Sequence, residues 1–533
     1  MPRAAPSRAG SGAAALLLLL AVATPATAQT DPFAPHLRWV HGPTAGSWLP
    51  RSLDFVGPGD LLWSAGSVGS PRLMLLAADE LPDFTGGSPL VGEDPSIAGA
   101  QGTVSIAAGA DPTALFSLHQ LPTATAPLRT TEVARRAAGP SGALSVVWTR
   151  QLALVGNGAG CLALDGTGAL VAAAVNDAAS GSLRVEWLDA ASGALLAGRT
   201  LAGSTLRAME LSADGQRLAL LAGATLMVFD PTGAMLQQET LPLATNALAM
   251  SADGDSLLVG EGTSARLLRW NGNGYGEVFR TPVFLGEAVT RAAISDDGNV
   301  FALGWWDQVS GTGVRFQVWS GAALVYEALQ TAPGAPLQNF PEAVELTGDG
   351  RRAAFGAWGV GDASPELWLV DVPSATALLQ VDLPGSVRAL ALDETGTRVA
   401  VAMKHGHANQ FASTGEIRLH DTGERDLQLL SGPLAPTLSL ATQQPGASRS
   451  LFLFGTPGSV PTPFIGSVGT LWIQRSQPLR VFNRAADAGG RSDLNVAPDR
   501  IADQVGDPFS VQAAARVGGT LQFSETLLTP PRL

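Results

Sequence analysis

The 533-residue sequence has one cysteine, an excess of acidic over basic residues, and few long apolar runs. Because Cys161 stands alone, no disulfide can form within the chain, and packing must supply its stability. The formal net charge of −13 disfavours nucleic acid and anionic lipid as partners, since both would be repelled. After residue 28 every apolar run is interrupted by glycine, proline or charge, so no transmembrane segment is predicted.

The N-terminus has the pattern of a secretory signal peptide. Two arginines precede an apolar stretch over residues 13–23, and small residues follow it up to Ala28. That stretch is shorter than the roughly 20 residues that span a bilayer as a helix. We therefore expect cleavage after Ala28, which makes residues 1–28 the signal peptide and residues 29–36 the mature N-terminal segment. The expected location is the periplasm, the cell envelope or the medium.

A polar turn of the form Ser-x-Asp-Gly, or a close variant, recurs along the chain. Its six clear copies start at Asp165, Ser212, Ser251, Ser295, Thr347 and Asp393. Two weaker copies lie around Gly59 and Asp111, which gives eight units. Asp-Gly favours the positive φ that a tight hairpin needs, so each copy is expected to join two short apolar strands.

Each unit then continues with a third strand that ends in a polar residue. These residues are Asp189, Asp230, Asn271, Ser320, Asp371 and Asp421. Four antiparallel strands repeating every 40 to 50 residues, with almost no helical periodicity, predict an all-β chain that forms a β-propeller. We expect seven to eight blades, with eight favoured, over residues 37–432. Residues 36–40 are predicted to close the ring by pairing with the last blade.

The repeated units resemble those of the WD40 and YVTN-like propeller superfamily, through the Ser-x-Asp-Gly turns and the polar end of the third strand. The Gly-His pair of WD40 repeats is missing, and the Trp-Asp pair survives only as a bulky residue followed by a polar one, as in Phe229-Asp230 and Trp319-Ser320. The resemblance implies a secreted bacterial propeller.

Residues 433–533 follow a different pattern. Short alternating apolar runs separated by Gly, Pro and Asp turns predict a small β-sandwich. The stretch Asp487–Arg491 and the pair Pro498-Asp499 resemble a module found at the C-termini of secreted bacterial proteins. That resemblance implies a structural or attachment role.

The loops between second and third strands are expected on the ring face opposite the Asp-Gly turns, together with the links between blades. Three long loops lie in consecutive units, over residues 305–313, 357–366 and 404–415. Loops on a rigid scaffold are where binding residues concentrate. The candidate binding residues are Trp305, Trp306, Asp307, Trp358, Asp362, Lys404, His405 and His407.

Neighbouring strand residues point to opposite sides, so one of Trp305 and Trp306 is expected to fill the space between blades. The other would join an exposed aromatic and acidic patch, which suits a protein or a sugar. His405 and His407 could present two imidazoles to one metal ion, but zinc needs a third protein ligand, so a solvated loop is favoured.

No metal or cofactor is predicted elsewhere. Residues 271–277 resemble a calcium loop only faintly, because Tyr275 stands where an oxygen ligand is needed, and a hairpin explains them better. Cys161 is predicted to be a small core residue.

Three functions remain open at this point. The favoured one is an exported, non-catalytic interaction or scaffold protein that binds an extracytoplasmic protein or glycan. The alternative is a quinoprotein-like or hydrolytic propeller enzyme, such as a lactonase. Residues 189–193 and 230–233 match the start of a quinoprotein repeat, but aliphatic residues near Leu195 and Met235 replace its docking tryptophan. A purely structural surface component cannot be separated from the first function by sequence.

Overall fold

The structure is a computed structural model. It describes residues 37–42, 48–57, 61–66, 73–78, 90–94, 102–109, 112–122, 129–139, 142–155, 160–243, 246–332, 335, 337–360, 364–410, 414–422, 426–429, 438–443, 449–455, 457–463, 467–468, 470–473, 479–486, 491–496, 510–517 and 520–528. The predicted signal peptide and mature N-terminal segment, residues 1–36, lie outside this set.

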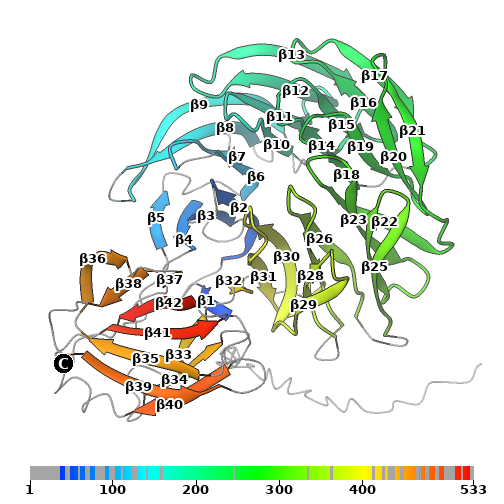
Figure 1. The fold of residues 1–533 in the computed structure, drawn as a ribbon. Helices are drawn as coiled ribbons and strands as arrows, with labels where there is room; N and C mark the ends of the chain where they lie inside the picture. Colours follow the sequence, from blue (N-terminus) through cyan, green and yellow to red (C-terminus); the bar gives the residue numbers. More distant parts are fainter. Residues whose placement is uncertain are drawn as a thin grey trace, which may run out of the picture. The chain divides into compact units, whose positions relative to one another are not determined.

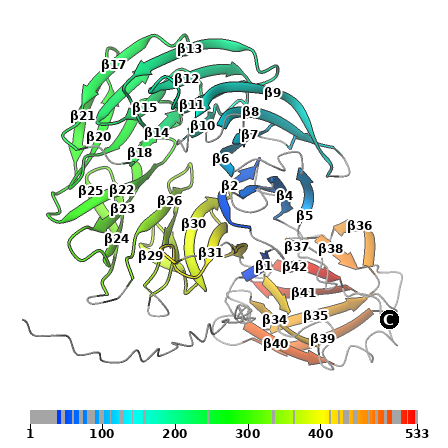
Figure 2. The same cartoon turned by 180° about the vertical axis from the view of Figure 1, so that it is seen from behind.

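Eight four-stranded antiparallel sheets form an eight-bladed β-propeller, which Figures 1 and 2 show from opposite sides. Blades 1 to 4 are β2 (Pro50–Val56), β3 (Leu61–Gly66), β4 (Leu73–Ala77), β5 (Leu90–Asp94); β6 (Gly102–Ala108), β7 (Leu115–Pro122), β8 (Arg129–Ala138), β9 (Leu144–Val155); β10 (Gly160–Leu164), β11 (Leu170–Asp177), β12 (Ser182–Asp189), β13 (Leu195–Ala202); and β14 (Leu206–Leu211), β15 (Leu218–Ala222), β16 (Thr225–Phe229), β17 (Met235–Thr240).

Blades 5 to 8 are β18 (Leu248–Met250), β19 (Ser256–Gly260), β20 (Ala265–Trp270), β21 (Tyr275–Arg280); β22 (Glu287–Ile294), β23 (Val300–Asp307), β24 (Val314–Ser320), β25 (Ala323–Gln330); β26 (Pro341–Leu346), β27 (Arg352–Ala357), β28 (Leu367–Asp371), β29 (Thr376–Val381); and β30 (Gly385–Leu392), β31 (Arg398–His405), β32 (Gly415–Asp421), β1 (Leu37–His41). The part of the chain that the structure describes contains no helix long and apolar enough to cross a membrane.

The ring is closed by the first strand of the chain. β1 pairs antiparallel with β32, with Trp39 opposite Leu419 and His41 opposite Ile417. Blade 8 therefore combines strands from both ends of the propeller sequence. The predicted all-β propeller, the favoured count of eight blades and the predicted closing strand are all confirmed.

Packing between neighbouring blades explains why the strands are apolar on both sides. In the described part of the propeller, eight hydrophobic clusters each join one pair of neighbouring blades. Between blades 3 and 4, the rings of Trp187 and Phe229 meet edge to face at 5.8 Å. Between blades 8 and 1, Leu419 packs in one cluster with Phe55. The apolar surface that these contacts remove from water stabilises the ring.

The Ser-x-Asp-Gly turns are held by their own side chains. In blade 6, the Ser295 hydroxyl donates to Asp297 at 2.6 Å and accepts the N–H of Val300 at 3.0 Å. Asp297 also accepts the N–H of Asn299 at 2.9 Å. Gly298 has φ 68°, a conformation that costs other residues about 1–2 kcal/mol. The polar turn inside each apolar run therefore closes a β-hairpin, and its own side-chain hydrogen bonds stabilise it.

These turns also connect the blades through the backbone. The N–H of the second turn residue donates to the carbonyl of the corresponding residue in the next blade, at distances of 2.7 to 3.2 Å. The bonded pairs are Gly166–Ala213, Ala213–Ala252, Ala252–Asp296 and Asp296–Gly348. A chain of hydrogen bonds thus runs along one ring face from blade 3 to blade 7.

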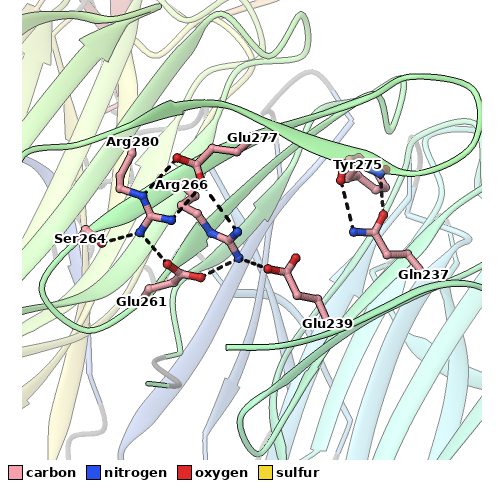
Figure 3. Close-up of polar contacts among 8 residues, drawn as sticks. All are labelled: Gln237, Glu239, Glu261, Ser264, Arg266, Tyr275, Glu277 and Arg280. Carbon is pink, nitrogen blue, oxygen red and sulfur yellow. Dashed lines mark hydrogen bonds and ion pairs between the residues drawn. The ribbon is translucent and has the colours of Figure 1, made fainter. Parts of the chain in front are cut away.

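Ion pairs add a further link between blades 4 and 5 (Figure 3). Arg266 contacts the carboxylates of Glu239 at 2.9 Å and Glu261 at 2.6 Å. Arg280 contacts Glu261 and Glu277, each at 2.8 Å. Glu239 belongs to blade 4 and the other four residues belong to blade 5. Because the Glu261 side chain is only 3% exposed, this network stabilises the junction only while both arginines stay in place.

After the last blade the chain forms three further sheets. Their strands are β33 (Asp426–Leu429), β34 (Leu438–Gln443), β35 (Arg449–Gly455), β36 (Pro457–Pro463), β37 (Ser467–Val468), β38 (Thr470–Ile473), β39 (Leu479–Ala485), β40 (Arg491–Val496), β41 (Ser510–Val517) and β42 (Thr520–Leu528). The sheet orders are β33-β34-β40, β37-β42-β41-β35-β39 and β36-β38. The predicted boundary at residue 432 stays a prediction; β33, which lies just before it, pairs with β34. The β-sandwich stays a prediction, and residues 487–490 and 498–499 of its motif lie outside the described residues.

Candidate binding face

The innermost strand of most blades carries a bulge near its beginning. The pairing with the second strand shifts by one residue there in blades 1, 2, 4, 6, 7 and 8. The residues left opposite no partner are Arg51, Val104, Arg207, Thr290, Glu342 and Arg388. Bulges redirect side chains and are frequent at functional sites. This end of the strand faces the links between blades, so we call it the long-loop face.

Four cations lie near one another at this end of the central channel, and the Glu342 carboxylate lies beside the three arginines. Arg291 and Arg388 each approach the Glu342 carboxylate at 3.8 Å. Burial, followed by repulsion from Arg388, lowers the pKa of Arg51, and the same two causes lower the pKa of Lys404. We call Arg51, Arg291, Arg388 and Lys404 the cationic cluster.

Beside the cationic cluster lies a row of aromatic side chains. Ring centroids are separated by 5.5 Å for Trp306–Phe340, 5.1 Å for Phe340–Trp358 and 6.1 Å for Trp358–His407. The Arg291 guanidinium lies 5.5 Å from the centre of the Phe340 ring. We call these four rings the aromatic row. They come from blades 6, 7 and 8 and from the link before blade 7, so the long loops do converge.

The aromatic row is also fixed by polar contacts. The Trp358 indole N–H donates to Glu342 at 2.8 Å, which places this carboxylate between the cations and the rings. The His407 Nε2 lies 2.6 Å from the carbonyl oxygen of Gln338 in the link before blade 7. The Lys404 ammonium donates to the carbonyl of Ala408 at 2.9 Å. These bonds hold the loops in one arrangement.

The other candidate residues take structural positions. Trp305 is completely buried and packs edge to face on Phe284 at 5.0 Å, so it fills the space between blades as expected of one of the two tryptophans. Asp307 accepts the N–H of Val309 and so shapes its own turn. The His405 Nε2 lies 2.9 Å from the Glu416 carboxylate. Asp362 lies outside the described residues.

Within the described part of the chain, no three His, Cys, Asp or Glu side chains are grouped as a metal site requires. His405 and His407 lie next to different partners, Glu416 and the Gln338 carbonyl. Two imidazoles engaged in this way do not converge on one ion. The geometry of the long-loop face therefore favours binding through rings and cations.

Exposed apolar side chains extend the long-loop face over blades 4 to 6. The exposed fractions are 54% for Leu243, 58% for Val283, 89% for Leu285 and 83% for Val309. Leu243, Val283 and Leu285 lie in links between blades, and Val309 lies in the second-to-third-strand loop of blade 6. We call these four residues the apolar edge.

The apolar edge belongs to loops that touch one another. The N–H of Gln308, next to Val309, donates to the carbonyl of Gly286 at 2.8 Å, and the N–H of Val289 donates to the carbonyl of Gly262 at 2.8 Å. Gly262 in turn faces the Leu243 side chain. The four residues are thus presented together by bonded loops.

Deeper in the channel the innermost strands line a cavity of about 480 Å³. One position of the innermost strand is equivalent in all eight blades. It lies three residues after the bulge residue or, in blades without a bulge, two residues before the first residue of the Ser-x-Asp-Gly turn. This position is alanine in five blades. In blades 1, 4 and 7 it is an acid: Asp54, Glu210 and Glu345. Burial raises the pKa of Asp54 to about 7 and that of Glu210 to about 7. Burial, with repulsion from the other two acids, raises the pKa of Glu345 to about 8.

Sequence reasoning found the aromatic row in part and missed the cationic cluster except for Lys404. Arg51, Arg291 and Arg388 each lie in a short apolar strand. In the sequence, a single arginine at such a position cannot be told from an ordinary surface charge. The three channel acids were missed as well. Aligning the innermost strands on their turns would have found Glu210 and Glu345, because the same position is alanine in most other blades.

The comparisons with known proteins concern the fold. The sequence matches no family model and no curated protein. Among solved structures, the chain is similar to the β-propeller domain of Cps50 (Swd1) from Myceliophteria thermophila, with a TM-score of 0.42 and 11% identical residues, over 72% of this chain and 99% of that one. The sequences share too few residues for a common ligand to follow from this likeness.

Proposed function

We propose that this protein is an exported, non-catalytic interaction protein that binds another protein through the long-loop face of its propeller. The observation that carries the proposal is the apolar edge. Leu285 and Val309 are more than four-fifths exposed, and large apolar side chains exposed together mark interaction surfaces. The export part rests on the signal-peptide pattern of residues 1–28.

The arrangement of the long-loop face supports a protein partner more than a glycan. Aromatic and aliphatic side chains at the centre of a surface, with arginines beside them, match the composition of protein interfaces. A glycan site needs rings open to the sugar, but Trp306, Phe340 and Trp358 are packed against one another and only part-exposed.

A capture experiment with matched variants tests the proposal. The tagged full chain is exposed to the secreted and envelope proteins of its host, and the retained proteins are identified. We expect Leu285→Asp together with Val309→Asp to abolish retention of the specific partner, because buried unpaired carboxylates oppose association. Both side chains are exposed, so the variant should fold normally.

The control makes the same kind of change on another exposed surface. Leu196, which is 58% exposed on the outermost strand of blade 3, and Met235, which is 52% exposed on that of blade 4, are replaced by Asp. This control should retain the partner. Equal retention by both variants would reject the long-loop face as the binding surface.

A further inference from the structure

The cationic cluster is an exception on a protein whose net charge is −13. The charge of Glu342 acts on Arg51, Arg291 and Arg388, whereas Lys404 is affected by Arg388. A further acid, Glu416 of blade 8, already accepts from Arg418 at 2.6 Å and lies 2.9 Å from His405. Among the described residues that interact within the cluster, positive charge therefore exceeds negative charge.

The arginines also have donors left over. The Arg388 Nε is buried and has no hydrogen-bond partner, and its contact with Glu342 is long, at 3.8 Å. The Arg51 side chain keeps much of its surface open to solvent, although the surrounding protein desolvates its charge in part, and it interacts with Arg388 and Glu342 through charge. Glu342 itself already accepts the Trp358 indole N–H. A buried donor without a partner is costly, and the neighbouring Arg51, which is exposed, offers donors to an acceptor from outside.

Repulsion within the cluster points the same way. Burial is the first cause that lowers the pKa of Arg51, Lys404 and Arg291, and repulsion from Arg388 lowers the pKa of each of them further. A bound anion would relieve this repulsion. Like charges gathered without sufficient counter-charge are typical of a surface that is complementary to a charged partner.

We propose that the cationic cluster binds side-chain carboxylates of an acidic peptide segment in the partner protein. The proposal rests on the proposed function and names the chemistry of the segment that reaches the channel. Arginine matches a planar carboxylate with two parallel donors. The aromatic row next to the cluster offers apolar contact to the rest of the peptide.

The channel acids limit how far such a segment can enter. Asp54 follows Arg51 by three residues on β2, and Glu345 follows Glu342 by three residues on β26, which places the acids roughly 10 Å deeper at about 3.3 Å per residue. Above about pH 8, where these acids are deprotonated, they would repel a carboxylate that moved past the arginines. Under those conditions the acidic segment is expected to cross the channel opening without threading through the ring.

Calorimetric titration of the full chain with short peptides tests the proposal. The probes are capped hexaglutamate, hexaglutamine and hexalysine, with oligogalacturonate as an anionic glycan. We expect hexaglutamate to bind at least about tenfold more tightly than the other three, with affinity that falls as salt rises. Arg51→Gln and Arg388→Gln should each weaken that binding by about tenfold.

Arg184→Gln is the matched control, because Arg184 lies on the third strand of blade 3 and is 41% exposed. It should leave hexaglutamate binding unchanged. Arg51 is exposed, so its variant reports on binding even if Arg388→Gln impairs folding. Binding of hexaglutamate that is no tighter than that of hexaglutamine, or that survives both arginine changes, would overturn the proposal.

Tighter binding of oligogalacturonate would also overturn it, in favour of an anionic glycan. These outcomes are separate from the test of the proposed function. Loss of partner capture in the Leu285 and Val309 variant with no effect of the arginine changes would retain the protein-binding face and reject the acidic segment.

Discussion

Replacing Glu345 with Gln should stabilise the propeller, and the gain should grow with pH. Glu345 lines the central cavity with Asp54 and Glu210, and burial with their repulsion raises its pKa to about 8 from the usual 4.5. In the folded protein it keeps a proton that the unfolded chain has released. Between about pH 4.5 and pH 8, stability therefore falls as pH rises, because the folded state binds more protons than the unfolded state.

The size of the effect follows from the two pKa values. Since each pKa unit corresponds to about 1.4 kcal/mol, the difference between 4.5 and about 8 sets an upper limit of about 5 kcal/mol above pH 8. Water in the cavity screens the carboxylate and reduces this cost. We expect Glu345→Gln to gain at least about 1 kcal/mol at pH 9 and close to nothing at pH 4.

Urea unfolding at a series of pH values from 4 to 9, followed by circular dichroism, measures this difference. Glu394→Gln removes an exposed carboxylate and controls for the change in total charge. A stability difference between Glu345→Gln and the native chain that stays constant with pH would refute the reasoning. So would a variant that is less stable than the native chain at pH 9.

Three further predictions concern the thiol, the ion-pair network and the turns. Burial raises the pKa of the Cys161 thiol to about 12, so it should not react with Ellman's reagent at pH 8 until the chain is unfolded. Glu261→Ala should cost about 3–5 kcal/mol in urea unfolding because it removes the closest carboxylate of Arg266, whose side chain is only 9% exposed. Glu239→Ala, at a side chain 36% exposed, should cost about 0–1 kcal/mol. Gly298→Ala should cost at least about 1 kcal/mol more than Gly181→Ala, since both glycines have positive φ but only at Gly298 would the new methyl group collide with a neighbouring blade.

The repeat made the fold predictable from the sequence. The turn motif at residues 295–298 and its counterparts predict hairpins at a regular spacing along the chain. Few folds are compatible with hairpins that repeat at such a spacing. The closing strand at Leu37–His41 was predictable because a ring needs a partner for its last blade. Nothing in the sequence indicated the β33 hairpin, because no recurring turn motif joins Asp426–Leu429 to its partner β34.

The binding face was predictable only in outline. Loop length pointed to the side of the ring where the aromatic row and the cationic cluster lie, and the aromatic character of Trp306 and Trp358 pointed to the same face. Burial separated Trp305 from Trp306, and no sequence signal says which of two neighbouring tryptophans faces the next blade. The cationic cluster was not predicted, because its four residues are spread over more than three hundred positions of the sequence, from Arg51 to Lys404. Only closure of the ring brings them together.

Hydrogen exchange of the full chain with and without its captured partner tests the central claim most directly. The claim is that the closed ring leaves its long-loop face free to bind. We predict added protection at residues 283–289, 306–312 and 404–410, with no change in the turns at residues 212–215, 251–254 and 295–298. Protection confined to those turns would contradict it.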